Sequence, residues 1–129
     1  MHRSVITNEE ALRRLTVNDE RFVDVVLTAR DEPPRVLALE PRTAELVRLG
    51  ALIALGAGDA AIDSTVAAAL AAGASHEDVV GVLVAVASSV GSARVVGMAP
   101  RIAAAIGYDV YGDLERVDLP VASGDRRFE

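Results

Sequence analysis

The sequence predicts an all-α protein of about six helices, and three observations support this fold class. Helix-start signals recur along the 129 residues, each a polar cap followed three positions later by an acidic residue. Between these signals, apolar residues recur at three- and four-residue spacing. The chain is 51% hydrophobic but only 3% aromatic, so its core must be aliphatic. Small side chains give each copy little area to bury, which favours association with further copies.

The N-terminal part is predicted to hold two short helices. Thr7 to Glu10 forms a capping box in which Thr7 is the cap and the Glu10 side chain reaches back to the backbone. The four residues from Thr16 repeat this signal and predict a second helix over residues 18–29. The two prolines at positions 33–34 end this part, because proline cannot continue a helix.

A longer helix is predicted to begin at Pro41, because the φ of proline suits the first helical position. Its inward face carries apolar or small residues at helical spacing: Leu46, Leu49, Ile53 and Gly56. The following helix is predicted over residues 59–72, with an inward face made of Ile62, Val66, Ala69 and Leu70. Gly73 suits the position just past the end of that helix.

Two further helices and a tail are predicted in the C-terminal half. Ser75 to Asp78 is another capping box, and the helix over residues 79–90 is apolar nearly all round, which predicts a central, buried position. The last helix, SARVVGMAPRIAAAIG, is predicted to be kinked or restarted at Pro100. From Tyr108 onward the chain is polar, and an extended tail is predicted there.

Two segments have an alternative interpretation. The stretch DVVGVLVAVASSVG could be a buried strand, but it is longer than most strands and directly follows a capping box, so a helix is favoured. Residues 56–61 match the G-x-G-x-x-A pattern of a dinucleotide-binding turn. That pattern needs a second strand before an acidic residue, and AALAAGAS, before Glu77, is not typical of a strand. A glycine-rich turn between two helices is therefore favoured.

The composition argues against several classes of function. The net charge is −6 and all 13 basic residues are scattered arginines, so no binding to nucleic acid is expected. Without cysteine there is no disulfide, no thiolate nucleophile and no sulfur-ligated metal. His2 and His76 are too far apart along the chain to suggest a metal site, so no metal and no cofactor are expected. No signal-peptide core and no apolar run of roughly 18 residues is found, so a cytoplasmic protein without membrane contact is expected.

Three stretches, LEPRTAELVRLGALIALG, AAALAAGASHEDVVGVL and SSVGSA, follow one another in this order and spacing. Together they resemble the core of the carboxymuconolactone decarboxylase family, which also includes the alkylhydroperoxidase D-like proteins. The resemblance implies an all-helical fold with a helical hairpin at its centre, and assembly of copies into trimers or hexamers. It divides the chain into N-terminal helices and connector (1–38), a carboxymuconolactone decarboxylase-like core (39–107) and a polar C-terminal tail (108–129).

The same resemblance implies where the reactive residues of the peroxidase-like branch would lie. In that branch, a Cys-x-x-Cys pair attacks peroxide while a glutamate and a histidine move protons. The two cysteines would fall at Gly58 and Ala61, and the histidine at Thr65. Because the thiolate is the reactive form, this chemistry cannot run without cysteine.

The decarboxylase branch of the family is matched no better. Its pattern on the next helix places Gly81, Ala85 and Ser89 at the positions to be compared, and with Thr65 they replace ionisable or aromatic groups. Neither Thr nor Ser has a pKa near neutral to serve as a proton donor. The resemblance therefore implies the family scaffold without its usual catalytic Cys and His.

The remaining polar residues of the predicted hairpin define a candidate pocket, made of Asp63, Thr65, Ser88, Ser89 and Arg94. In the functional interpretation, the hydroxyls orient a ligand and the arginine holds its carboxylate. In the structural interpretation, which is favoured, the two serines bond back to their own helix carbonyls, and Arg94 and Arg101 form ion pairs at the surface or a subunit interface. His76 is expected to be exposed at a helix start and not catalytic, and Glu45 to stabilise the start of its helix.

Three functions remain open from the sequence. The first is a homo-oligomer of this family that lacks peroxidase chemistry and binds a small acidic metabolite. The second is a decarboxylase or lyase that acts on a small lactone or carboxylate through a rearranged pocket. The third is a helical module that binds another protein.

Overall fold

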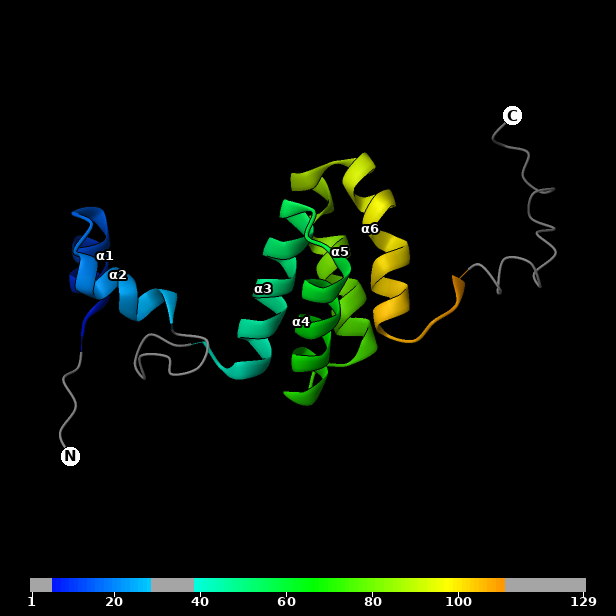
Figure 1. Ribbon diagram of the computed structural model, residues 1–129, viewed down its shortest axis with the longest axis horizontal. Coiled ribbons are helices and arrows are strands. Elements are labelled where there is room, and N and C mark those ends of the chain that lie inside the picture. Colours follow the sequence, from blue (N-terminus) through cyan, green and yellow to red (C-terminus); the bar gives the residue numbers. More distant parts are fainter. Residues whose placement is uncertain (1–5, 29–38, 111–129) are drawn as a thin grey trace. The chain divides into compact units, whose positions relative to one another are not determined.

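The computed structural model describes residues 6–28 and 39–110, and within these ranges it contains six helices and no strand (Figure 1). The all-α fold class is therefore confirmed. The chain divides into two compact units, Met1–Glu40 and Pro41–Glu129. No helix among the described residues is both long and apolar enough to cross a membrane.

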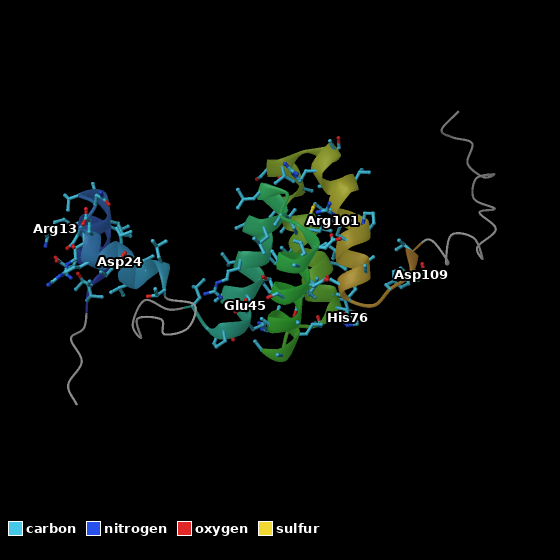
Figure 2. All side chains as sticks on the ribbon, viewed as in Figure 1. Arg13, Asp24, Glu45, His76, Arg101 and Asp109 are labelled. Atoms are coloured by element: carbon cyan, nitrogen blue, oxygen red, sulfur yellow. The ribbon has the colours of Figure 1, made fainter. Side chains whose placement is uncertain are left out.

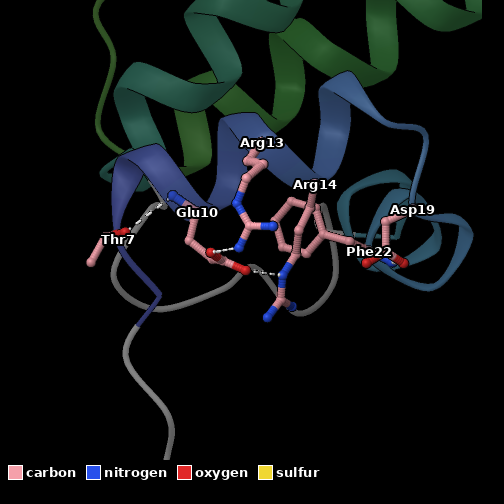
Figure 3. A network of polar contacts seen from close by, with 6 residues as sticks. All are labelled: Thr7, Glu10, Arg13, Arg14, Asp19 and Phe22. Atoms are coloured by element: carbon pink, nitrogen blue, oxygen red, sulfur yellow. Dashed lines mark hydrogen bonds and ion pairs between the residues drawn. The ribbon is translucent and has the colours of Figure 1, made fainter.

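The first unit contains α1 (Asn8–Thr16), and Thr7 caps this helix as predicted. The Thr7 hydroxyl oxygen accepts a hydrogen bond from the Glu10 backbone N–H at 3.1 Å. The Glu10 side chain does not close a capping box but is bound by Arg13 and by Arg14, whose Nε donates at 2.7 Å (Figure 3). The hydrogen bond from Arg14, followed by that from Arg13, holds the pKa of Glu10 below its ordinary value.

The second helix, α2 (Glu20–Leu27), begins later than predicted. Its cap is Asp19, whose carboxylate accepts from the Phe22 backbone N–H, while Asn18 adopts a left-handed turn conformation with φ of 56°. Phe22 is buried, and the Arg14 guanidinium lies 5.8 Å from the centre of its ring. The predicted stop at the two prolines lies outside the described residues.

The second unit is an antiparallel arrangement of four helices that run up and down in turn: α3 (Pro41–Leu55), α4 (Asp59–Ala71), α5 (His76–Val90) and α6 (Ser92–Ala105) (Figure 1). Helix α3 packs against α4 and α5, and α6 packs against α4 and α5. The buried cluster between them is aliphatic and contains Leu49, Ile53, Ile62, Val66, Val79, Leu83, Met98 and Ile102. Both the α3–α4 turn and the α5–α6 turn therefore lie at the same end of this unit.

Most of the predicted element boundaries and faces in this unit are confirmed. Pro41 begins α3, the inward residues Ile62, Val66 and Ala69 of α4 are buried, and Gly73 has a φ of +104° just past its end. The Ser75–Asp78 capping box is closed in both directions. Residues 56–58 form a turn between two helices, and the valine-rich stretch is helical, so both alternative interpretations are wrong.

The prediction that α5 is central and buried holds for only one side of the helix in the single chain. Val79 and Leu83 are buried, but Val80 and Val84 are 43% and 68% exposed, and Gly81 lies on the same open side. The reason is geometric: α3, α4 and α6 pack against α5 from one side only, so an apolar composition all round leaves an apolar face uncovered.

The last helix is continuous through Pro100, so the predicted restart is wrong. A proline inside a helix leaves the carbonyl four positions earlier without its partner, here that of Val96. Val96 is 70% exposed, so water can reach that carbonyl and the helix tolerates the loss. Of the predicted C-terminal tail, only Tyr108 to Val110 are described; the remainder lies outside the described residues.

Candidate functional site

A small pocket lies where the first half of α6 meets the turn between α3 and α4. Its volume is about 160 Å³. The lining comes from one residue of the turn and five of α6: Gly56, Ala93, Arg94, Gly97, Met98 and Arg101. Two of these six residues are arginines, so the pocket is basic although the whole chain carries a net charge of −6.

The spacing along α6 explains why these residues share the pocket. Arg94, Gly97, Met98 and Arg101 stand three or four positions apart and so lie on one face of the helix. Gly97 lies between the two arginines and has no side chain, so the space between them stays open. Met98 is only 3% exposed and belongs to the hydrophobic core, so it forms an apolar floor beneath the charged groups.

Arg101 ties α6 to the start of α4. Its Nη1 donates a hydrogen bond to the Ala57 carbonyl oxygen at 2.8 Å, and its Nε lies 3.3 Å from Oδ1 of Asp59. The Asp59 carboxylate therefore neutralises much of the charge that Arg101 brings to the pocket. The side chain of Arg101 remains 43% exposed, and that of Asp59 75%.

Arg94 is placed differently, because its guanidinium makes no hydrogen bond or ion pair with any residue of the described ranges. The guanidinium lies against the backbone of Gly56, just past the C-terminal end of α3. A Cβ built on Gly56 would lie 2.9 Å from Cζ of Arg94. Only glycine at residue 56 therefore leaves room for the Arg94 guanidinium where it lies. The negative end of the α3 dipole stabilises the Arg94 cation at this position, and the N–H donors of the guanidinium remain available to a ligand.

Of the five residues predicted to form a pocket, only Arg94 lines this one. Asp63 is exposed on α4, Thr65 is 3% exposed within the core, and Ser88 and Ser89 are exposed near the end of α5. The favoured back-bonds from the two serines to their helix carbonyls are absent from the described hydrogen bonds, whereas Thr16 forms such a bond in α1.

Arg101 is not among the residues predicted for the candidate pocket, although the sequence carries a signal for it. Arg94 and Arg101 are seven positions apart, which is two helical turns and therefore the same face. Combined with a small residue at position 97, this spacing predicts two cations beside a gap. The contact of Arg101 with Ala57 had no such signal, because the two residues are 44 positions apart in the chain.

The other end of the four-helix unit carries the remaining polar residues of interest. Figure 2 shows Glu45 and His76 toward its lower end, away from Arg101. The Glu45 carboxylate accepts a hydrogen bond from Arg48 at 2.8 Å, and its side chain is 14% exposed. His76 is exposed at the first position of α5, as predicted.

Asp78 joins two helix starts at this lower end. Its Oδ2 accepts hydrogen bonds from the Ser75 backbone N–H at 2.9 Å and from Nη1 of Arg42 at 3.2 Å. The hydrogen bond from Ser75 is the main cause of a pKa for Asp78 below its ordinary value. These groups are thus engaged in holding helices together. Among the described residues, no group of three or more His, Asp or Glu side chains is arranged to hold a metal ion.

Comparison with known proteins gives one match. The model of the carboxymuconolactone decarboxylase family matches residues 37–105, which is just over half of the chain and covers all four helices of the second unit. No curated protein and no solved structure matches the chain.

Proposed function

The chain belongs to the carboxymuconolactone decarboxylase family, and we propose that it is a homo-oligomeric member that binds a small organic acid and lacks thiol peroxidase chemistry. The observation that carries this proposal is the pocket of about 160 Å³ beside the unengaged guanidinium of Arg94. Arg94, rather than the hydroxyls of α4 and α5, holds the carboxylate of the ligand.

A carboxylate suits this pocket by charge and shape. Guanidinium presents parallel N–H donors that match the two oxygens of a carboxylate, and such charge-assisted pairs are stronger than neutral hydrogen bonds. Because Arg94 has no partner among the described residues, an incoming carboxylate displaces no internal bond. The pocket is open to solvent and has a volume of about 160 Å³, so it has room for only a small acid.

The absence of thiol chemistry follows from the composition. The protein contains no cysteine, and a thiolate is the species that attacks peroxide. The pocket also favours binding over decarboxylation, since Arg remains protonated at neutral pH and so does not exchange protons with a ligand. Asp59, the nearby carboxylate, is paired with Arg101.

Association of copies is supported by the uncovered apolar side of α5, where Val80 and Val84 are exposed. Further large apolar side chains are exposed on the neighbouring helix α3, with Val47 at 57% and Leu55 at 77%. Contact with further copies removes such surface from water, and we expect a trimer or hexamer.

Titration with propionate at low ionic strength tests the binding proposal. Arg94→Ala should weaken propionate binding by about tenfold or more, which corresponds to the loss of a charge-assisted pair. Arg21→Ala is the matched control, because Arg21 is also exposed and also has no partner among the described residues. It removes the same charge from α2 and should leave the affinity unchanged. Equal effects of the two variants, or no binding by the unmodified protein, would overturn the proposal.

A further inference from the structure

We propose that the pocket selects monocarboxylates over dianions because Asp59 withholds the second arginine from the ligand. This inference rests on the proposed function, since it concerns which acids Arg94 accepts. It assigns a specificity-determining role to Asp59, which does not line the pocket itself.

A ligand in the pocket meets two arginines of unequal availability. Arg94 offers its full set of donors, whereas Arg101 already donates to the Ala57 carbonyl and lies 3.3 Å from Asp59. The three side chains together carry a single net positive charge. One carboxylate neutralises it, and a second anionic group would have to displace Asp59 from Arg101 or lie beside it. Like charges at such short range repel each other.

The remaining lining of the pocket is apolar or without a side chain. Away from the two guanidinium groups, the lining consists of Ala93, Met98 and two glycines. A short alkyl tail that lies on Met98 and Ala93 removes its own apolar surface from water, which is favourable. A second carboxylate in that place loses water without gaining a hydrogen-bond donor, which is unfavourable.

The experiment follows Met98 directly, because the protein contains only two methionines and Met98 is the one in the pocket. The protein is labelled at the methionine methyl groups, and Met98→Leu assigns the signal. Propionate, malonate, inorganic phosphate and uncharged propionamide are titrated at neutral pH and constant ionic strength. Propionate should shift the Met98 signal at concentrations about tenfold lower than malonate or phosphate require. Propionamide should leave the Met98 signal unshifted.

Asp59→Asn tests the role of the carboxylate itself. Removing its charge releases Arg101, so the affinity for malonate and phosphate should rise by about tenfold while that for propionate changes little. Asp63→Asn is the matched control: it removes the same charge from an exposed position one turn further along α4. This variant should leave the preference for propionate intact, since Asp63 forms no described ion pair.

The outcomes separate this inference from the proposed function. Suppose that Arg94→Ala loses all acid binding, but that the unmodified protein binds propionate and malonate with equal affinity. This result would overturn the selectivity and leave the proposed function standing. An unchanged preference in Asp59→Asn would overturn the role of Asp59. Binding that Arg94→Ala does not weaken would overturn both.

Discussion

At the residue scale, the position of Arg94 depends on the absence of a side chain at residue 56. Gly56 combines a φ of +68° with a position at which an added Cβ would meet the Arg94 guanidinium. Gly73 also has a positive φ, of +104°, but a Cβ there would meet nothing within 4 Å. Substitution of these two glycines therefore distinguishes two effects: alanine at residue 73 strains the backbone alone, whereas alanine at residue 56 also displaces Arg94.

Gly56→Ala should lower both stability and propionate affinity, whereas Gly73→Ala should lower stability alone. Each alanine costs on the order of 1 kcal/mol because it occupies a left-handed backbone conformation. Only the alanine at residue 56 also pushes Arg94 away from its place. Urea denaturation and propionate titration of both variants measure the two effects. Unaltered affinity in Gly56→Ala would show that Arg94 does not bind from this position.

A second residue, Thr65, carries a buried hydroxyl that forms no hydrogen bond within the described ranges. A buried polar group without a partner costs stability, whereas an apolar group of the same shape does not. Thr65→Val should therefore raise the free energy of unfolding by about 1 kcal/mol, as measured by urea denaturation. A loss of stability would instead show that the hydroxyl has a hydrogen-bond partner in solution and would contradict the prediction.

At the element scale, the capping box of α5 also holds the start of α3. The Asp78 carboxylate accepts from Ser75 within its own helix start and from Arg42 of α3. Because the folded-state pKa of Asp78 lies below the ordinary value of 3.8, folding favours the charged form. The resulting stability is present above that value and is lost as the pH falls through the lowered pKa.

Asp78→Asn should therefore destabilise the protein near neutral pH and have a shrinking effect as the pH drops below 3.8. Glu10 has a lowered pKa too and contributes to acid unfolding with the same sign, so the difference between variant and unmodified protein isolates Asp78. Urea denaturation over a pH series measures it. Glu77→Gln, which removes a neighbouring carboxylate without a described partner, is the control. A constant difference at all pH values would contradict the prediction.

At the scale of the whole molecule, the uncovered side of α5 predicts self-association. Val84, 68% exposed, lies on this side between helical turns that also expose Val80 and small residues. Val84→Lys should shift the protein to smaller species in sedimentation velocity at micromolar concentration, because burying a lysine between copies is unfavourable. A monomeric unmodified protein would contradict the proposed oligomer.

The control for this prediction is Ala67→Lys. Ala67 is exposed on α4, where Asp63 and Ser64 are also exposed, so that side of the unit is already polar. The added lysine changes the net charge by the same amount as Val84→Lys and should leave the assembly intact. Dissociation by both variants would indicate a general charge effect.

The sequence by itself determined where most helices begin and end, because these boundaries depend on local groups. Pro41, the Ser75–Asp78 box and Gly73 act within one or two turns of the residues that they organise. Local signals misled where two of them overlapped, as at residues 16–19, where Asp19 rather than Thr16 caps α2, and at Pro100, through which α6 continues. The sequence also placed Arg94 among the candidate pocket residues, and its binding of a ligand stays a prediction.

Only the tertiary structure decided which surfaces are covered and which charges are free. The apolar sequence of α5 would allow burial on every side. One side stays exposed because the other helices of a single chain cover only part of its surface. Likewise, the pairing of Arg101 with Ala57 and Asp59, and the lack of a partner for Arg94, depend on how α6 lies against a turn 44 positions away. The distance in space between α6 and this turn cannot be read from residue types and their spacing, because it is set by the packing of all four helices together.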